Sequence, residues 1–454
     1  MALIELDRTA QPEAQALSAP PAYRYRLPGL LLAAVLLLVC GGASTGAPAQ
    51  WRYLGALPLP GNSETQSRLV GDRVYTISSV GVRRTAGAWQ VGKPPRRLWT
   101  ANVPVRVSGP EAVGYGGVDA KQAGDLVLLS DGPATTVADA RTGAIRWRSP
   151  VAVTPLPGGR IGLVQNQVFR AGTAYDQDSG APGPLYFSGT GEPHTEPPVR
   201  TDISGVDLAT GATRWTASAP GSINVFTAPG DAPAVLVLAS DRLERLDGET
   251  GAVRHDIQLP EIGGAGPAGG EITDGLLVVR YGDYAPDGQE VGYAADSLAK
   301  RWQRPVTEVL LDPPGCGDLL CAGPRGALDV LDPATGRAAW RAPAGVDLGE
   351  RNGYVLERDA DGGKPLRLVE RATGATRVEL TGWDAVLSPD SVAEDQPLVL
   401  RRGLPGGKSA FGAVLNDRVR PLGVSAGPVS GCLADRGYLI CRGGAGLEIW
   451  AYGG

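Results

Sequence analysis

The chain has 454 residues, of which 65 are glycine, 38 are proline and four are phenylalanine. This composition suits short strands joined by tight turns and argues against long helices. The net charge of -5 is mild, so the composition gives no indication of a nucleic-acid partner.

The first 50 residues differ from the rest of the chain. Residues 1–26 are polar and show no strand or helix periodicity, which predicts a disordered tail. Residues 27–43 (LPGLLLAAVLLLVCGGA) carry no charge over 17 residues, about 26 Å as a helix and therefore at the short end of a membrane span. Arg24 and Arg26 precede this segment, so the positive-inside rule predicts a cytoplasmic tail, a linker at 44–50 and everything from Trp51 outside.

The apolar segment has three fates that fit its sequence. An uncleaved signal anchor is preferred, because a tail of 26 residues is long for a signal peptide. Cleavage after Ala49, in the sequence APA, would instead secrete the protein. Lipidation of Cys40 is the third fate, although Val39 stands where a lipidation site normally needs a small residue.

A nine-residue phrase recurs along the rest of the chain. It has an acidic residue, Thr-Gly three residues on and an aromatic residue eight after the acid. The copies are DARTGAIRW from Asp139, DLATGATRW from Asp207, DGETGAVRH from Asp247, DPATGRAAW from Asp332 and ERATGATRV from Glu370, with a shortened copy, DSLAKRW, from Asp296 to Trp302. Successive acids are 68, 40, 49, 36 and 38 residues apart, so most gaps lie near 40. Such a period predicts a propeller or a solenoid that uses residues 51–454 as one domain.

Each copy of the phrase predicts a turn between two strands. Apolar runs such as LVLLS near Leu126 and AVLVLAS near Ala234 indicate strands, each followed by a second strand that ends in the acid. The acid can accept hydrogen bonds from the turn backbone, glycine supplies a positive φ, and the tryptophan lies on the next strand against a neighbouring sheet. The predicted docking residues are Asp139, Thr142, Gly143, Trp147, Asp207, Thr210, Gly211, Trp215, Asp247, Gly251, Trp302, Asp332, Thr335, Gly336 and Trp340.

A strand, Asp-x-x-Thr-Gly and a tryptophan together resemble the tryptophan-docking repeat of quinoprotein-type, or PQQ-like, β-propellers. That family includes quinoprotein alcohol dehydrogenases and the non-enzymatic assembly lipoprotein BamB. The resemblance implies an all-β propeller of four-stranded blades. Counting apolar runs gives eight or nine hairpins, so we expect eight blades, within a range of seven to nine. Trp51 to Pro58 resembles a missing outer strand, and we expect it to complete the last sheet and close the ring.

Four cysteines form two local pairs, Cys316 with Cys321 and Cys432 with Cys441. We expect two disulfides in an oxidising compartment, the second of them across a hairpin. The alternatives are four buried free thiols or a zinc site. The C-x4-C and C-x8-C spacings and the presence of only two histidines argue against zinc.

Catalytic residues are scarce in the sequence. His194 lies in a loop without a nucleophile motif, which predicts a solvated side chain, and His255 takes the place of a repeat tryptophan, which predicts a packing role. The acidic stretches DQDSG at 176–180 and DADGG at 359–363 are interpreted as hairpin turns rather than calcium loops. The dehydrogenases of the family carry adjacent cysteines against the cofactor, and this chain has none. No catalytic residue, cofactor or metal ligand is therefore predicted.

The segment at 173–200 is too long for a turn within a blade, so it is interpreted as a loop insertion. Tyr175, Tyr186 and Phe187 are its candidate partner contacts. The alternative is that the insertion is an unselected decoration. The function favoured by the sequence is a non-catalytic, membrane-anchored scaffold that binds an envelope protein or a small ligand outside the cell. The alternatives are an enzyme, either a PQQ-dependent dehydrogenase or a hydrolase, and an extracellular sensor that uses the central funnel.

Overall fold

The computed structural model divides the chain into residues 1–50 and residues 51–454. It describes residues 51–59, 64–80, 83–103, 119–176, 178, 180, 183–228, 230, 232–282, 288–306, 316, 319–324, 326–351, 353–387 and 397–453. The predicted tail, membrane segment and linker, with Cys40 and Ala49, lie outside the described residues. Within the described ranges, no helix is both long and apolar enough to cross a membrane.

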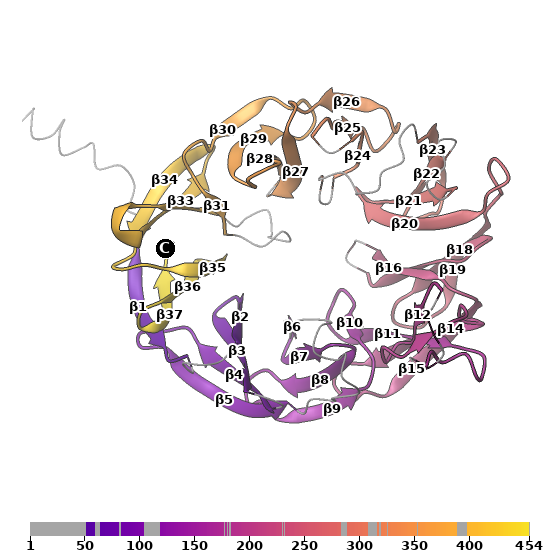
Figure 1. The fold of residues 1–454 in the computed structure, drawn as a ribbon, viewed down its shortest axis with the longest axis horizontal. Helices are drawn as coiled ribbons and strands as arrows, with labels where there is room; N and C mark the ends of the chain where they lie inside the picture. The colour runs from indigo at the N-terminus through magenta and orange to yellow at the C-terminus, as the bar shows by residue number, and fades with distance from the viewer. Residues whose placement is uncertain are drawn as a thin grey trace, which may run out of the picture. The chain divides into compact units, whose positions relative to one another are not determined.

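The part of the chain from Trp51 onward forms a ring of antiparallel sheets, seen face-on in Figure 1. Nine of the ten described sheets form the ring, and we number them blades 1 to 9 in chain order. Eight of them have four strands, and blade 6 has three strands among the described residues. The all-β propeller is therefore confirmed. The count falls within the predicted range of seven to nine, but it is one more than the eight that we preferred.

The first five blades follow one another from residue 64 to residue 305. Their strands are β2 (Glu64–Val70), β3 (Arg73–Val80), β4 (Arg83–Gln90) and β5 (Arg96–Val103) in blade 1; β6 (Asp119–Ala123), β7 (Leu126–Asp131), β8 (Ala134–Asp139) and β9 (Ile145–Ser149) in blade 2; β10 (Val153–Pro155), β11 (Ile161–Val168), β14 (Arg200–Asp207) and β15 (Thr213–Pro220) in blade 3; β16 (Asn224–Ala228), β17 (Ala234–Leu238), β18 (Arg242–Asp247) and β19 (Val253–Gln258) in blade 4; and β20 (Pro267–Thr273), β21 (Leu276–Tyr281), β22 (Gln289–Ala294) and β23 (Lys300–Pro305) in blade 5. The short strands β12 (Tyr186–Phe187) and β13 (Pro193–His194) form a separate ribbon.

The last four blades complete the ring. Their strands are β24 (Cys321–Ala322), β25 (Asp329–Leu331) and β26 (Ala338–Arg341) in blade 6; β27 (Val346–Arg351), β28 (Tyr354–Asp359), β29 (Pro365–Glu370) and β30 (Thr376–Glu379) in blade 7; β31 (Ala385–Val386), β32 (Leu398–Gly403), β33 (Ser409–Leu415) and β34 (Arg418–Val424) in blade 8; and β35 (Ser430–Asp435), β36 (Tyr438–Gly443), β37 (Gly446–Ala451) and β1 (Arg52–Leu57) in blade 9. A 3-10 turn, η3 (Pro405–Gly407), joins β32 to β33.

The position of a strand within its blade decides its composition. The second strand of blade 4, β17, reads AVLVL and is buried at every residue, because sheets cover both of its faces. The outer strand β19 of the same blade reads VRHDIQ and is almost entirely exposed. The apolar runs that the sequence makes conspicuous are therefore the second strands of the blades.

The hydrophobic core lies between blades. Leu128 of blade 2 packs in one cluster with Leu208 of blade 3, and Leu236 of blade 4 packs in another with Leu277 of blade 5. Comparable clusters join blade 9 to blade 1, blade 1 to blade 2, blade 3 to blade 4, blade 5 to blade 6, blade 6 to blade 7 and blade 7 to blade 8. Blade stacking, rather than one central core, therefore supplies the apolar burial that holds the ring together.

The two ends of the ring meet in blade 9. Strand β1 pairs with β37, from Arg52 opposite Ala451 to Leu57 opposite Leu447. The prediction that the residues after Trp51 supply the missing outer strand is therefore confirmed. Trp51 itself stacks on Phe411 of blade 8 and on Trp450 of blade 9, with ring centroids 5.2 and 5.6 Å apart. Aromatic packing thus joins blades 8 and 9 at the point where the chain closes the ring.

Candidate functional site

Each Asp-x-x-Thr-Gly copy forms a tight turn that is held by its own acid. Asp139 Oδ1 accepts hydrogen bonds from the backbone N–H of Arg141 at 3.0 Å, the backbone N–H of Thr142 at 2.9 Å and the Thr142 hydroxyl at 3.0 Å. Gly143 closes the turn by donating its N–H to the Asp139 carbonyl at 2.8 Å, with a φ of 72°. The same pattern recurs at Asp207 with Thr210 and Gly211, at Asp247 with Thr250 and Gly251, and at Asp332 with Thr335 and Gly336.

The tryptophan of one blade docks on the turn of the next blade. Its indole N–H donates to the carbonyl of the residue after the acid position, at 2.8–3.1 Å. The pairs are Trp99 with Ala140, Trp147 with Leu208, Trp215 with Gly248, Trp302 with Pro333 and Trp340 with Arg371. A buried indole N–H needs an acceptor, so this bond fixes both the position and the orientation of each ring.

The motif glycine is required because the ring lies directly on it. A Cβ at Gly211 would lie 2.7 Å from Trp147 Cδ2, and one at Gly336 would lie 2.6 Å from Trp302 Cδ2. No side chain fits at that distance, and a positive φ further disfavours any residue with a Cβ. The repeated motif thus supplies both halves of the contact between neighbouring blades. Its tryptophan provides the ring on one blade, and its turn provides the surface that receives the ring of the preceding blade.

An arginine that the sequence analysis overlooked completes four of these turns. It stands seven residues after the acid and pairs with it: Arg146 with Asp139 at 2.9 Å, Arg254 with Asp247 at 2.7 Å, Arg377 with Glu370 at 3.3 Å, and Arg214 with Asp207. The arginine and the turn donors stabilise the carboxylate, lowering the pKa of Asp139 and of Asp247 to about 2. The signal was present in the sequence, since Arg precedes the final residue of DARTGAIRW and of three other copies.

Blade 5 carries an altered turn, and its register corrects the sequence alignment. The Ala294 N–H donates to the Ala299 carbonyl, and the Leu298 N–H to the Ala294 carbonyl, as Asp139 and Gly143 do in blade 2. The copy is therefore not shortened. It runs over the full nine residues from Ala294 to Trp302, and Asp296 is not at the acid position. Leu298 takes the place of the glycine, with a φ of 57° and almost complete burial.

His255 belongs to the same altered joint. It lies on the outer strand of blade 4, where the other copies have the docking tryptophan, but its side chain is exposed. The prediction that His255 packs in place of tryptophan is therefore wrong. Leu298 lies between blades 4 and 5 among buried apolar residues of both, so a side chain from the turn replaces the ring that docks elsewhere.

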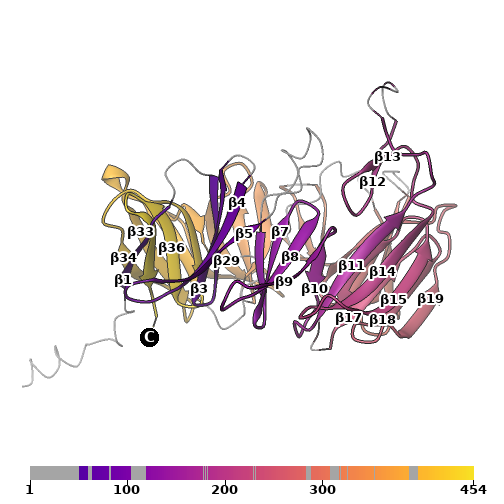
Figure 2. The same cartoon turned by 90° about the horizontal axis from the view of Figure 1, so that it is seen from below.

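The insertion at 173–200 is a built structure rather than a loose loop. The Val199 N–H donates to the Val168 carbonyl at its base, and Arg170 pairs with Glu196 at 3.1 Å. Farther out, β12 pairs with β13, with Tyr186 opposite His194. Figure 2 shows this ribbon above one face of blade 3, beyond the strands of the ring.

His194 is the centre of the insertion. Its ring stacks on Phe169 with centroids 3.7 Å apart and planes 2° apart, and its Nδ1 lies 3.2 Å from the Thr173 hydroxyl. Only 8% of the residue is exposed. The prediction of a solvated loop histidine is therefore wrong, because Phe169, directly after β11, offers the ring an apolar face that the loop sequence alone does not reveal.

The three candidate contact residues have different environments. Phe187 is the most exposed, at 56% of its surface, and Tyr186 beside it is half-buried. Tyr175 donates its hydroxyl to the Gly180 carbonyl at 3.0 Å, so it fixes the backbone of the insertion itself. Phe187 is thus the apolar side chain that the ribbon presents to solvent.

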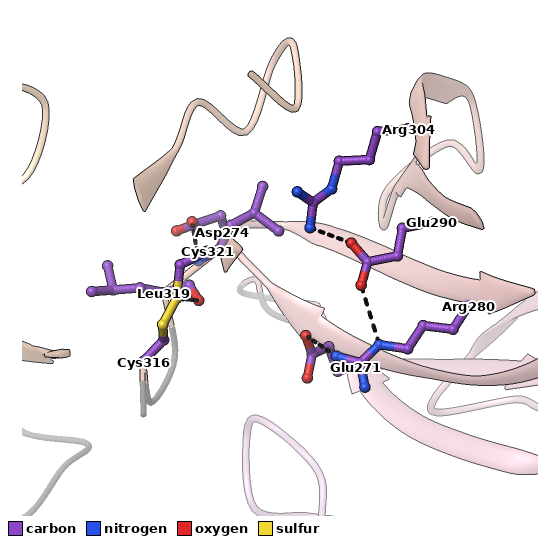
Figure 3. The surroundings of a disulfide bond; sticks show 9 residues. Glu271, Asp274, Arg280, Glu290, Arg304, Cys316, Leu319 and Cys321 are labelled. Atoms are coloured by element: carbon purple, nitrogen blue, oxygen red, sulfur yellow. Dashed lines mark hydrogen bonds and ion pairs between the residues drawn. A yellow bond between two sulfur atoms is a disulfide. The ribbon is translucent and has the colours of Figure 1, made fainter. Parts of the chain in front are cut away.

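Both cysteine pairs form disulfides. Cys432 and Cys441 lie on the adjacent strands β35 and β36, with Cα atoms 4.1 Å apart. Cys316 and Cys321, with Cα atoms 6.5 Å apart, close a short loop at the start of blade 6, shown in Figure 3. The Cys432–Cys441 bond reinforces an existing hairpin. The Cys316–Cys321 bond instead fixes a loop whose Leu319 and Leu320 are buried against neighbouring blades.

Charged residues tie the Cys316–Cys321 loop to the blades on both sides. Asp274, in the β20–β21 turn of blade 5, accepts the Leu320 N–H at 3.3 Å and pairs with Arg371 of blade 7. Beside it in Figure 3, Glu290 lies between Arg280 and Arg304 and accepts hydrogen bonds from both. These carboxylates are neutralised by arginine, so this part of blade 5 is a structural network.

The acidic stretches considered for calcium have other roles. Asp359 to Gly363 forms the β28–β29 turn, in which the Gly363 N–H donates to the Asp359 carbonyl at 2.7 Å. Asp176 caps the local backbone by accepting the Asp178 N–H at 3.1 Å. Among the described residues, no group of three or more His, Cys, Asp or Glu side chains could hold a metal ion.

The fold is a β-propeller whose blades are joined by docked tryptophans. Residues 199–360 match the family model described as "Outer membrane protein assembly factor BamB", which confirms the PQQ-like resemblance over blades 4, 5 and 6 and parts of blades 3 and 7.

Three solved structures each align with most of the chain. BamB from Moraxella catarrhalis is 15% identical, with a TM-score of 0.38, covering 88% of this chain and 99% of its own. The Pan2 WD40 domain of Neurospora crassa is 11% identical, with a TM-score of 0.31, covering 88% and 95%. The C-terminal WD40 domain of Sif2 is 9% identical, with a TM-score of 0.35, covering 90% and 100%. No curated protein sequence matches the chain.

Proposed function

We propose that this protein is a non-catalytic scaffold of the bacterial cell envelope, anchored by residues 27–43, whose propeller binds a protein partner outside the membrane through the insertion at 173–200. The observation that carries the proposal is the ribbon β12–β13. It is fixed from within by the buried His194 and presents the exposed Phe187. A rigid platform with an exposed aromatic residue is typical of a protein-binding surface.

Two further observations support a scaffold in the envelope. The family matched by residues 199–360 is named for an assembly factor of the outer membrane, which favours protein partners over a reaction. The two disulfides favour an oxidising compartment, where such bonds persist. The described acidic side chains of the docking turns are engaged with backbone N–H groups and arginine, which suits a structural role.

The partner surface we propose is small, aromatic and supported by charge at its base. Phe187 supplies an apolar contact, and the Arg170–Glu196 pair at the base is exposed. An aromatic anchor of this kind fits an apolar pocket or groove on a partner protein.

The first experiment is crosslinking of the full-length protein in intact membranes, followed by identification of captured envelope proteins. The test variant is Phe187→Ala, and the matched control is Val253→Ala, an apolar residue exposed to a similar extent (53%) on blade 4. We expect one envelope protein to be captured by the native chain and by the control and to be lost with Phe187→Ala. The same capture with all three proteins would overturn the proposal.

The two histidines give a second matched pair. His194→Ala should loosen the ribbon and weaken the same crosslink, because it removes the stacked ring and its hydrogen bond to Thr173. His255→Ala removes an exposed ring on blade 4 and should leave the crosslink unchanged. If the two variants behaved alike, the fixed geometry of the insertion would not matter for binding.

The anchor is tested separately. A retained signal anchor should leave the full chain in the membrane fraction after alkaline carbonate extraction, with the propeller open to a protease added outside the cells. A protein that begins at Gln50 in the medium would show cleavage after Ala49 and overturn the anchored form.

A further inference from the structure

A row of polar side chains crosses one end of blade 1. Arg73 at the start of β3 lies opposite Gln90 at the end of β4, and Gln90 lies opposite Arg96 at the start of β5. The row lies on the same face as Tyr75 and Trp99, which pack against blade 2. The polar row therefore borders the interface between blades 1 and 2.

The docking joint brings a third arginine to this row. Trp99 donates its indole N–H to Ala140 at 3.1 Å, which places the turn of blade 2, with Arg141 and Thr142, over the end of β5. A cavity of about 290 Å³ remains between them. Its lining residues are Arg73, Gln90, Arg96, Leu98, Arg141 and Thr142.

This row departs from the pattern of the other blades. The position of Gln90 is that of the motif acid, as the hydrogen bond of the following Val91 N–H to Asp72 shows. The position of Arg73 is apolar in blades 2 and 3, with Leu126 opposite Asp139 and Ile161 opposite Asp207. Blade 1 has thus lost a negative charge and gained a positive one at a pair of facing positions.

The nearby carboxylates are already engaged by other groups. Asp72 accepts a hydrogen bond from Gln90 Nε2 at 2.6 Å, and Asp139 pairs with Arg146 at 2.9 Å. Within the described part of the chain, none of the three cavity arginines forms an ion pair. The Thr142 hydroxyl donates to Asp139 and Arg73 lies beside the Tyr75 hydroxyl, so the guanidinium groups of Arg96 and Arg141 are the donors of the cavity without a partner among the described residues.

The protein around Arg73 satisfies its guanidinium only in part. Its Nε and Nη1 are buried and have no hydrogen-bond partner among the described residues, and it is the one described arginine with two such nitrogens. These two nitrogens are closed to solvent and do not form a parallel pair, so an oxyanion in the cavity would reach Arg73 through Nη2 and would meet the parallel N–H donors of Arg96 and Arg141.

We infer that this cavity binds a compact anion with more than one negative charge, namely a phosphoryl group, held by Arg73, Arg96 and Arg141. Three guanidinium groups with no carboxylate partner match the charge of phosphate, and the planar donors match its oxygens. The site lies on blade 1, whereas the proposed partner surface lies on blade 3, so it adds a second ligand to the scaffold.

The test uses the full-length protein and measures binding of inorganic phosphate by calorimetry and by the shift in melting temperature, at constant ionic strength set with chloride. Arg73→Leu restores the apolar row of blades 2 and 3, so we expect it to fold and to bind phosphate at least about tenfold more weakly, the loss expected for a charge-assisted hydrogen bond. Arg96→Gln, at an exposed position, should weaken binding without affecting the fold. Arg148→Gln removes an exposed arginine of blade 2 outside the cavity and is the matched control.

A second arm compares inorganic phosphate with a monosaccharide phosphate, which separates free phosphate from a phosphoryl group carried on a small molecule. Saturable binding of either anion that is lost in Arg73→Leu and Arg96→Gln but kept in Arg148→Gln would support the site. No saturable binding of either anion, or equal binding by all variants, would overturn it.

Discussion

Gly211 gives the sharpest test of how the blades are joined. The residue has a φ of 75°, and a Cβ added there would lie 2.7 Å from Trp147 Cδ2 in the docked ring. Gly211→Ala therefore forces Trp147 away from the turn and breaks its 2.8 Å hydrogen bond to the Leu208 carbonyl. Gly124, in the β6–β7 turn, has a φ of 59° with nothing within 4 Å of an added Cβ, so Gly124→Ala is the matched control.

The magnitude follows from what each variant loses. Gly124→Ala costs only the steric strain of a Cβ in the left-handed backbone conformation, about 1–2 kcal/mol. Gly211→Ala loses the same amount, plus about 1 kcal/mol for the hydrogen bond and part of the burial of a ring that covers roughly 150 Å² or more. We therefore expect Gly211→Ala to lower the free energy of unfolding by about 3–5 kcal/mol, two to three times the effect of the control.

The assay is urea denaturation of both variants and of the native protein, followed by tryptophan fluorescence and by far-ultraviolet circular dichroism. A displaced Trp147 should also shift its fluorescence in the folded state, which Gly124→Ala should leave unchanged. Equal destabilisation by the two variants, with no fluorescence change, would refute the role of the glycine as a seat for the ring.

Three further outcomes are expected. His255→Trp should destabilise the protein alone and less so together with Leu298→Gly, because Leu298 occupies the joint that a ring would need; additive effects in a double-mutant cycle of melting temperatures would contradict this. Replacing Cys316 and Cys321 by serine should lower the free energy of unfolding by about 2 kcal/mol, the chain-entropy estimate for so short a loop, as measured by urea denaturation; an unchanged midpoint would show that packing alone fixes the loop. The pKa of Asp139 is lowered to about 2, so its contribution to stability is present at neutral pH and is lost as the pH falls from about 4 toward 2; Asp139→Asn should flatten this part of the acid-unfolding curve, and an unaltered curve would argue against it.

The sequence predicted the joints well because their chemistry is local. An acid, a threonine and a glycine within five residues encode both the turn and the seat, so the pattern Asp207-x-x-Thr210-Gly211 could be interpreted without knowing the fold. The tryptophan also stands at a fixed distance from its own turn. The turn that receives the tryptophan ring lies in the next repeat, so the regular spacing of the repeats predicts which turn that is.

The sequence misled where an acid was used to set the alignment. Asp296 suggested a shortened copy, whereas the backbone hydrogen bonds place Ala294 at the acid position. The environment of His194 was hidden for another reason, since its stacking partner Phe169 lies 25 residues away along the chain. The blade count also exceeded the preferred number, because blades 1, 8 and 9 lack the nine-residue motif and apolar runs alone do not separate eight blades from nine.

The joints that depart from the repeat differ in what replaces the lost packing. Between blades 4 and 5, Leu298 fills the place of a ring, and between blades 8 and 9 the Trp51 stack does so. At the edge of the joint between blades 1 and 2, Arg73 stands where blades 2 and 3 have an apolar residue, and it lines the arginine cavity. A departure that gathers like charges without an ion-pair partner among the described residues is expected at a functional position, whereas the first two departures are repairs of the ring. The arginine cavity is therefore the part of the propeller where a ligand, rather than blade stacking, best explains the choice of residues.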